Sequence, residues 1–134
     1  MYEVNSHLLK LVTDLGLELC FVNMERSGIY FAEEKTIFLS NNLLDENSDF
    51  EISHELGHCI EKHEKLSAYY NANDYSRRKL EFEANRIAIE ILLFIWSNEY
   101  DFEKEQLNAV KFMEYYKIPW SLENCVRETM RNYG

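Results

Sequence analysis

The sequence predicts an α+β fold in which a small antiparallel sheet packs against several helices. Short runs of β-branched and aromatic residues occur only in the first third of the chain, and helical periodicity dominates the rest. The 134 residues, 46% of them hydrophobic, suit one ordinary domain with a packed core. We therefore predict a single domain over residues 1–134, with a core of about residues 15–97 and a helical carboxyl-terminal part of about residues 100–134.

The amino-terminal part is expected to form one helix and three strands. Apolar residues recur at helical spacing through residues 2–15, and Gly16 is suited to end that helix. Three β-like runs follow, at residues 17–22, 28–32 and 36–40. Only Glu-Glu-Lys separates the last two runs, which favours a tight hairpin.

The rest of the chain is expected to be helical. Ser48 and Glu51 have the spacing of a capping box, which predicts a helix from about residue 49. After a loop at about residues 67–75, the pattern predicts a long helix over 76–97 and two shorter ones at about 102–117 and 122–132. Pro119 separates the last two, and Ser121 is placed to cap the final helix.

The motif that carries chemistry is His54-Glu55-Leu56-Gly57-His58. Histidines at positions i and i+4 of a helix lie nearly above one another, so both imidazoles can bind one zinc ion. Glu55 lies about 100° further round the helix, where it misses the ion but reaches a water bound to it. Such a water loses its proton near neutral pH, and Glu55 is the predicted general base that accepts it.

An accidental motif on a solvated helix face is the alternative. Counted at about 100° per residue, the polar side of this helix carries Glu51, His54, Glu55, His58 and Glu61. The other side carries Ile52, Leu56, Cys59 and Ile60. The apolar side can anchor the helix on a core, which favours the functional interpretation.

A catalytic zinc ion usually has three protein ligands, so a third must come from a distant segment. The long helix is apolar nearly all round, and a carboxylate on it is costly unless it is paired or bound to metal. We predict Glu83 as the third ligand, with Glu81 as the rival on a different face of that helix. An ordinary ion pair of Glu83 with Arg86 or Arg77 is the alternative.

These segments resemble a known family. HELGHCIEKH, followed by LEFEANRIAIEILL, is similar to the ImmA/IrrE metallopeptidases, and the resemblance covers roughly residues 15–95. It implies a zincin-like fold and a gluzincin-type site, with His54 and His58 as zinc ligands, Glu55 as the catalytic residue and Glu83 of the Glu-Ala-Asn segment as the third ligand. Members of the family act in bacteria, often from prophages or mobile elements, and cleave a helix-turn-helix repressor to relieve repression.

The chain departs from the family pattern in two respects. It is short for the family, which leaves less surface for a sensing domain. It also has Arg86-Ile87 where a bulky aromatic residue often follows Glu-Ala-Asn, a change expected to affect packing.

Composition and charge limit the possible partners. A net charge of −10 opposes binding to phosphate backbones, so we expect no direct contact with nucleic acid, although a basic protein partner is suited. The longest apolar stretch, residues 87–96, is too short to span a bilayer, and the start of the chain lacks the pattern of a signal peptide. We expect a cytoplasmic protein.

Two further features of a peptidase are left open by the sequence. The oxyanion of the reaction needs a stabilising group, for which Tyr69, Tyr70, Tyr75 and Asn85 are candidates. An extended substrate could pair with an edge strand beside the site, and the strand Thr-Ile-Phe-Leu-Ser at residues 36–40 precedes the motif helix.

The sequence therefore predicts a zinc-dependent endopeptidase that cleaves a protein substrate, plausibly a DNA-binding repressor. The alternative is a zinc-containing protein that binds and sequesters such a regulator without cleaving it. A purely structural helical domain is a third hypothesis, which the absence of zinc binding would favour.

Overall fold

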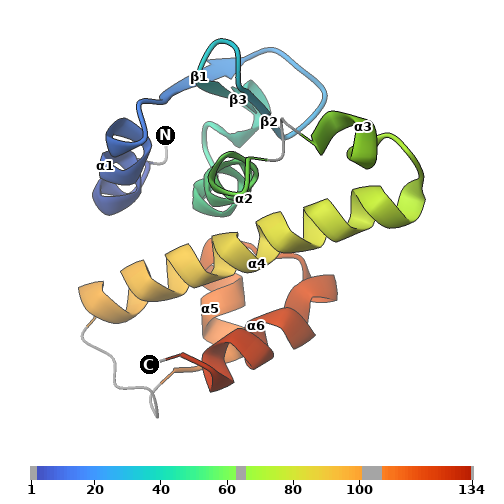
Figure 1. Cartoon of the computed structure of the whole chain (residues 1–134). Coiled ribbons are helices and arrows are strands. Elements are labelled where there is room, and N and C mark those ends of the chain that lie inside the picture. Colours follow the sequence, from blue (N-terminus) through green and yellow to red (C-terminus); the bar gives the residue numbers. More distant parts are fainter. Residues whose placement is uncertain (1–2, 63–65, 101–106, 134) are drawn as a thin grey trace.

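A computed structural model describes residues 3–62, 66–100 and 107–133. The element order begins with a helix and three strands and continues as helices, which confirms the predicted α+β class. Figure 1 shows the layers: the sheet lies on one side, α2 (Asp49–Ile60) lies under it, and the long α4 (Asp74–Glu99) crosses beneath α2. The remaining helices, α5 (Ala109–Tyr116) and α6 (Glu123–Arg131), cover the far side of α4.

The first helix is α1 (Ser6–Asp14), which begins where the side chain of Asn5 accepts hydrogen bonds from the backbone N–H groups of His7 and Leu8. It ends as predicted before Gly16, which has a φ of +74° that an L side chain rarely adopts. The strands are β1 (Glu18–Val22), β2 (Gly28–Phe31) and β3 (Thr36–Ser40).

The sheet is mixed, which corrects the prediction of a wholly antiparallel one. The expected hairpin forms, because β2 pairs antiparallel with β3. However, β1 pairs parallel with β3, so the strand order is β1-β3-β2. The segment at residues 36–40 is therefore the central strand and not an edge, and β2 is the edge strand on the side of the motif helix.

The start of α2 also differs from the prediction. The side chain of Ser48 makes no capping hydrogen bond, so the capping box with Glu51 is not formed. Instead, the side-chain oxygen of Asn47 accepts the hydrogen bond from the backbone N–H of Asp49. The predicted loop at residues 67–75 contains the short helix α3 (Ser67–Tyr70).

The carboxyl-terminal helices agree in part with the predictions. The predicted helix at 102–117 is present from Ala109 to Tyr116, and its first part, up to residue 106, lies outside the described residues. Ser121 does not cap the last helix, because residues 120–122 form a 3-10 turn that leads directly into α6. None of the helices within the described ranges combines the length and apolar character that crossing a membrane requires.

Two hydrophobic clusters hold the motif helix in place. One joins α1 and the sheet to the apolar side of α2, with Leu8, Ile37, Leu39, Ile52 and Leu56 fully buried. The other lies between α4, α5 and α6, with Leu92, Leu93, Phe112 and Val126 at its centre. Burial of this many large side chains, at about 1.5–3 kcal/mol each, fixes α2 and α4 relative to each other.

The close approach of α2 and α4 depends on Gly57, the glycine of the motif. A Cβ atom at this position would lie 2.7 Å from the carbonyl oxygen and 2.9 Å from the Cα of Ala84. In an exposed helix interior, Gly→Ala adds about 1 kcal/mol of stability. Here the obstructing atoms are backbone, so the two helices must move apart.

We therefore expect Gly57→Ala to reduce the free energy of unfolding of the metal-free protein by about 1–3 kcal/mol, the usual cost of overpacking. Urea unfolding followed by circular dichroism measures this change. An unchanged or larger free energy of unfolding would contradict the close backbone contact between α2 and α4.

Candidate metal centre between α2 and α4

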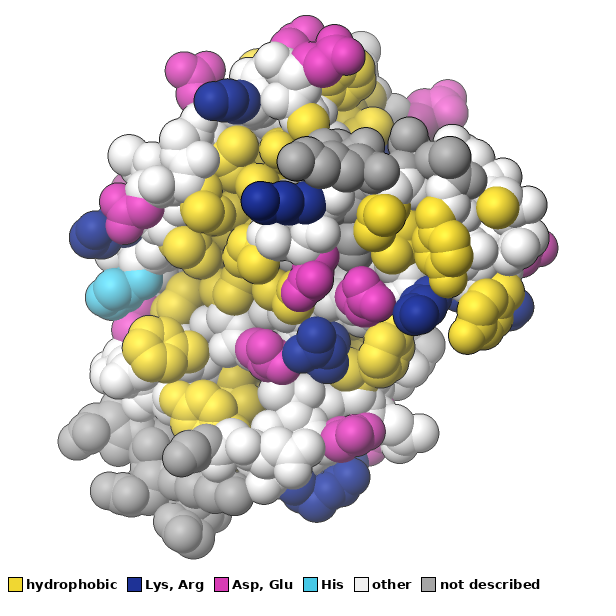
Figure 2. Space-filling model, in the orientation of Figure 1, with side chains coloured by type: hydrophobic (Ala, Val, Ile, Leu, Met, Phe, Trp, Pro, Cys, Tyr) yellow, Lys and Arg dark blue, Asp and Glu magenta, His cyan; other side chains and the backbone are white. Residues whose placement is uncertain are grey.

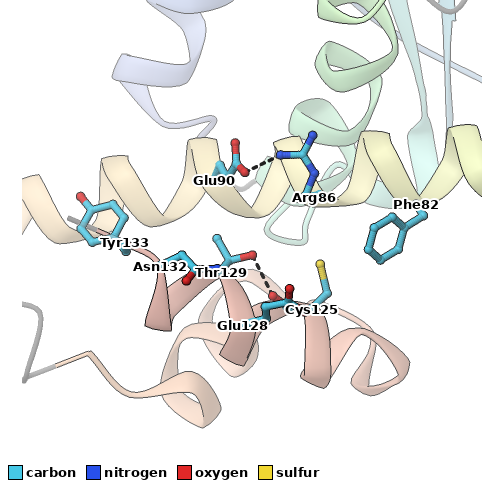
Figure 3. Close-up of a pocket in the computed structure, with 8 residues that line it drawn as sticks. All are labelled: Phe82, Arg86, Glu90, Cys125, Glu128, Thr129, Asn132 and Tyr133. Atoms are coloured by element: carbon cyan, nitrogen blue, oxygen red, sulfur yellow. Dashed lines mark hydrogen bonds and ion pairs between the residues drawn. The ribbon is translucent and has the colours of Figure 1, made fainter.

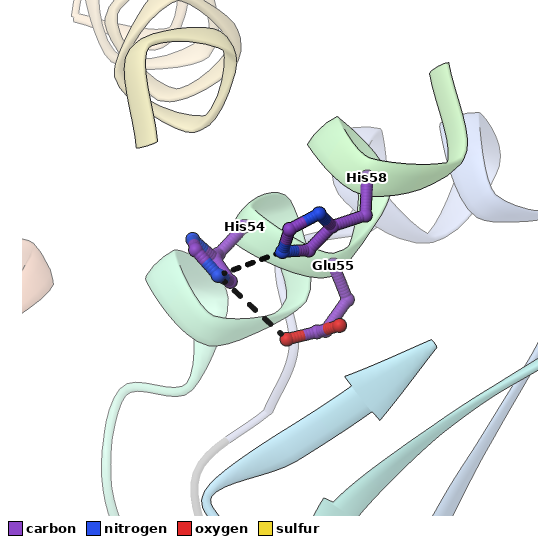
Figure 4. A group of neighbouring side chains, drawn as sticks. All are labelled: His54, Glu55 and His58. Atoms are coloured by element: carbon purple, nitrogen blue, oxygen red, sulfur yellow. Dashed lines mark hydrogen bonds and ion pairs between the residues drawn. The ribbon is translucent and has the colours of Figure 1, made fainter. Parts of the chain in front are cut away.

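The histidines of the motif lie one turn apart on α2, as the sequence predicts (Figure 4). Their Nε2 atoms are 3.2 Å apart, and each side chain is only 13% exposed. The ligand atoms of His54, Glu55 and His58 all lie within 4.8 Å of one another. The helix therefore brings the three motif residues together, with their side chains mostly shielded from solvent.

The carboxylate of Glu55 faces β2. One of its oxygens, Oε1, accepts a hydrogen bond of 2.8 Å from the backbone N–H of Tyr30. The other, Oε2, lies 3.9 Å from Nε2 of His54, a distance too long for a direct hydrogen bond but short enough for a shared water. Because the side chain is only 6% exposed, this single backbone donor fixes its orientation.

A fourth side chain, Glu81 of α4, completes the cluster. Its Oε2 lies 2.9 Å from Nε2 of His54, and its Oε1 lies 3.2 Å from Nε2 of His58. The predicted third carboxylate, Glu83, is about 200° further round the same helix. The carboxylate that the structure brings against both imidazoles is therefore that of Glu81, the residue named as the rival of Glu83.

Two polar side chains surround this cluster. Nδ1 of His54 lies 2.7 Å from Oδ1 of Asn85, one turn after Glu81 on α4. The hydroxyl of Tyr70 on α3 donates a hydrogen bond of 3.0 Å to Oε1 of Glu81, and the guanidinium carbon of Arg77 lies 5.6 Å from the Tyr70 ring centroid. Asn85 and Tyr70 therefore orient residues of the cluster, whereas the other two tyrosine candidates, Tyr69 and Tyr75, are exposed.

The charges in the cluster perturb its ionisation. Burial opposes the charged form of Glu81, but hydrogen bonds with His54 and His58 outweigh it and hold the pKa of this carboxyl far below its usual range. Burial also opposes the charged form of His54, yet the hydrogen bond with Glu81 and the charge of Glu55 outweigh it and raise the pKa of this imidazole. Burial raises the pKa of the nearby Glu51 carboxyl. The ionised carboxylate of Glu81 therefore favours a positive charge at this site, on an imidazole or on a bound cation.

The donor set fits a zinc ion. Asn85 Oδ1 accepts a hydrogen bond from Nδ1–H of His54, so in the neutral ring that binds a metal the Nε2 lone pair would face the cluster. Two nitrogens bound to one tetrahedral zinc at 2.0–2.1 Å would be about 3.3 Å apart. The 3.2 Å between the two Nε2 atoms matches that separation, and the Glu81 carboxylate supplies an oxygen donor on the same side.

A sequence signal for Glu81 and Asn85 does exist. The two residues are four apart, so one face of a helix presents both of them to the same neighbour. Glu83 and Asn85, which the Glu-Ala-Asn segment groups together, are again about 200° apart and cannot both face α2. The hydroxyl of Tyr70 had no comparable signal, because its approach depends on the fold of the segment between the two helices.

Comparison with known proteins places the chain in a family. The family model described as Peptidase_M78, IrrE N-terminal-like domain, matches residues 13–120, a range that contains the sheet, the motif helix and α4. No curated protein and no solved structure matches the chain. The family match confirms the resemblance that the motifs predicted and supports a peptidase. The chain belongs to the IrrE N-terminal-like domain family of peptidases.

Proposed function

We propose that this protein is a zinc-dependent endopeptidase whose ion is held by His54, His58 and Glu81. The observation that carries the proposal is the convergence of two imidazole nitrogens from α2 and one carboxylate from α4, all within 2.9–3.2 Å of one another. Glu81 replaces Glu83 in the predicted ligand set. A site of this kind leaves one position for water or for the substrate carbonyl.

The residues around the ligands suit hydrolysis of a peptide bond. Zinc, when bound, supplies a Lewis acid that polarises a carbonyl and makes a water acidic enough to lose its proton near neutral pH. Oε2 of Glu55 is the base that accepts this proton, while the Tyr30 N–H holds Oε1 and so aims the carboxylate. The proton then passes from Glu55 to the leaving amine. Asn85 and Tyr70 keep His54 and Glu81 in position.

The fold suggests where an extended substrate binds. Of the two outer strands of the sheet, β2 is the one that lies beside the motif helix, and its residue Tyr30 contacts the proposed base directly. A peptide that adds to this edge would place its main chain beside Glu55. This assigns to β2 the role that the sequence had suggested for residues 36–40.

A DNA-binding repressor remains the proposed substrate. The net charge of −10 favours approach of a basic protein and opposes binding of the DNA itself. The family resemblance stated for the HELGH and Glu-Ala-Asn segments supports the same class of substrate. The protein to test is a helix-turn-helix regulator chosen from the genes that neighbour the gene of this chain.

The test is incubation of the purified regulator with the zinc-loaded protein, followed by mass spectrometry of the products. We expect two fragments from one cut, no cleavage after removal of zinc by a chelator, and recovery when zinc is added back. A complex in which the regulator keeps its full length, with zinc present, would contradict the proposal and favour sequestration without cleavage.

A further inference from the structure

The outer side of α4 carries four exposed residues that no part of the proposed site uses. They follow one another at intervals of four along the helix: Phe82, Arg86, Glu90 and Phe94. The two phenylalanines are 51% and 62% exposed, and the side chains of Arg86 and Glu90 are 42% and 49% exposed. We call these four residues the α4 stripe. It is about 18 Å long, because a helix rises 1.5 Å per residue.

Two hollows border the α4 stripe. Figure 2 shows charged side chains between hydrophobic ones along α4. One hollow, of about 440 Å³, lies between α4 and α6 and is bordered on the α4 side by Phe82, Arg86 and Glu90, as Figure 3 shows. The other, of about 550 Å³, lies between α1 and α4 and is bordered by Phe94 and the apolar residues Leu11, Ile91 and Ile95. Exposed aromatic side chains beside hollows are typical of protein interfaces.

The order of residues in the stripe makes it complementary to itself. A two-fold axis that passes between Arg86 and Glu90 reverses the direction of the helix. It sets Arg86 opposite Glu90 of a second copy, and Glu90 opposite Arg86 of that copy. The same axis sets each Phe82 opposite Phe94.

We propose that the α4 stripe is the interface of a symmetric dimer of this chain. Each helix already makes one Arg86–Glu90 ion pair of 2.7 Å. The dimer adds two ion pairs between the copies. Each Phe94 approaches the hollow beside Phe82 of the second copy. Each Phe82 approaches the apolar hollow beside Phe94. A uniformly basic partner would suit Glu90 but would be repelled by Arg86, so a second copy fits the stripe better.

The dimer is independent of the proposed hydrolysis. The α4 stripe is centred about 140° round the helix from Glu81 and Asn85, which face α2. Docking therefore leaves the metal centre accessible in both copies. Because the stripe residues are exposed, substituting them also leaves the core of each copy unchanged.

Sedimentation velocity at about 0.15 M salt tests the proposal, since charges more than about 8 Å apart are screened there. We expect the wild-type protein to reach twice its 16.1 kDa mass as its concentration rises from micromolar to millimolar. Arg86→Glu and Glu90→Arg each place like charges opposite one another. Each alone should weaken the dimer more than about 100-fold, because like charges across an interface cost several kcal/mol.

Mixing these two variants gives the sharpest result. The Arg86→Glu copy then has glutamate at both positions, and the Glu90→Arg copy has arginine at both. Both central contacts between the two copies become attractive again, so a mixed dimer should form. Phe94→Ala should dissociate the wild-type dimer, whereas Phe31→Ala, at a phenylalanine that is 44% exposed on β2, should not. A monomeric wild-type protein at millimolar concentration would overturn the proposal. So would a dimer that persists in either charge variant, or a mixture that stays monomeric.

Discussion

Replacing Glu55 with Gln is expected to lower the rate of substrate cleavage by about 100- to 10,000-fold, the contribution typical of a general base. The amide oxygen of Gln still accepts the hydrogen bond from the Tyr30 N–H, so the side chain stays in place. It has no basic oxygen to take a proton from water. Zinc remains bound, because Glu55 is not one of the three proposed ligands.

The measurement combines single-turnover cleavage with zinc content by elemental analysis. Glu61→Gln is the matched control, because Glu61 is an exposed glutamate at the end of the same helix. This variant should cleave the substrate at the wild-type rate. Cleavage by Glu55→Gln at an unchanged rate, with zinc present, would show that another group is the base.

The second large effect is expected for Glu81→Gln. The substitution removes one ligand and the negative charge that faces both imidazoles. Loss of a residue that merely orients a ligand costs 10- to 100-fold in metal affinity, so loss of this ligand should cost more than about 100-fold. Activity should fall with zinc occupancy and be partly recovered at high zinc concentration.

Glu83→Gln is the matched control for this prediction, since it changes the same residue type two positions along α4. We expect its zinc affinity, measured by competition with a chromogenic chelator, to stay within a few-fold of the wild type. The reverse result, with Glu83→Gln losing zinc and Glu81→Gln retaining it, would reinstate the ligand that the sequence had favoured.

The motif helix was the part of the fold that could be predicted best. The alternation of polar and apolar sides in residues 49–60 depends only on local spacing, and the structure buries the predicted apolar residues Ile52 and Leu56 fully. The parallel pairing of β1 with β3 could not be predicted in the same way. It joins strands that are not consecutive in the chain, so no turn residue marks it.

The sequence could place candidate ligands that share one helix turn, but not a candidate that comes from a different helix. His54 and His58 are fixed by their spacing alone. The choice between Glu81 and Glu83 depends on the rotation of α4 about its axis. That rotation is set by the contact of Gly57 with the backbone of Ala84 and by the burial of Leu80 and Ala84.

A single helix therefore carries two independent surfaces. The side of α4 that faces α2 supplies Glu81 and Asn85 to the proposed metal centre. The opposite side carries the α4 stripe and the proposed dimer interface. Substitutions at Phe82 or Phe94 should thus alter assembly without altering zinc affinity, a separation that distinguishes the two proposals.

A crystal structure of the zinc-loaded protein, with the ion located by its anomalous scattering, tests the central claim most directly. We expect one zinc ion at 2.0–2.1 Å from Nε2 of both His54 and His58, and at 2.0–2.2 Å from a carboxylate oxygen of Glu81. A zinc ion bound by the two histidines with Glu81 turned away, or by a different set of residues, would contradict it.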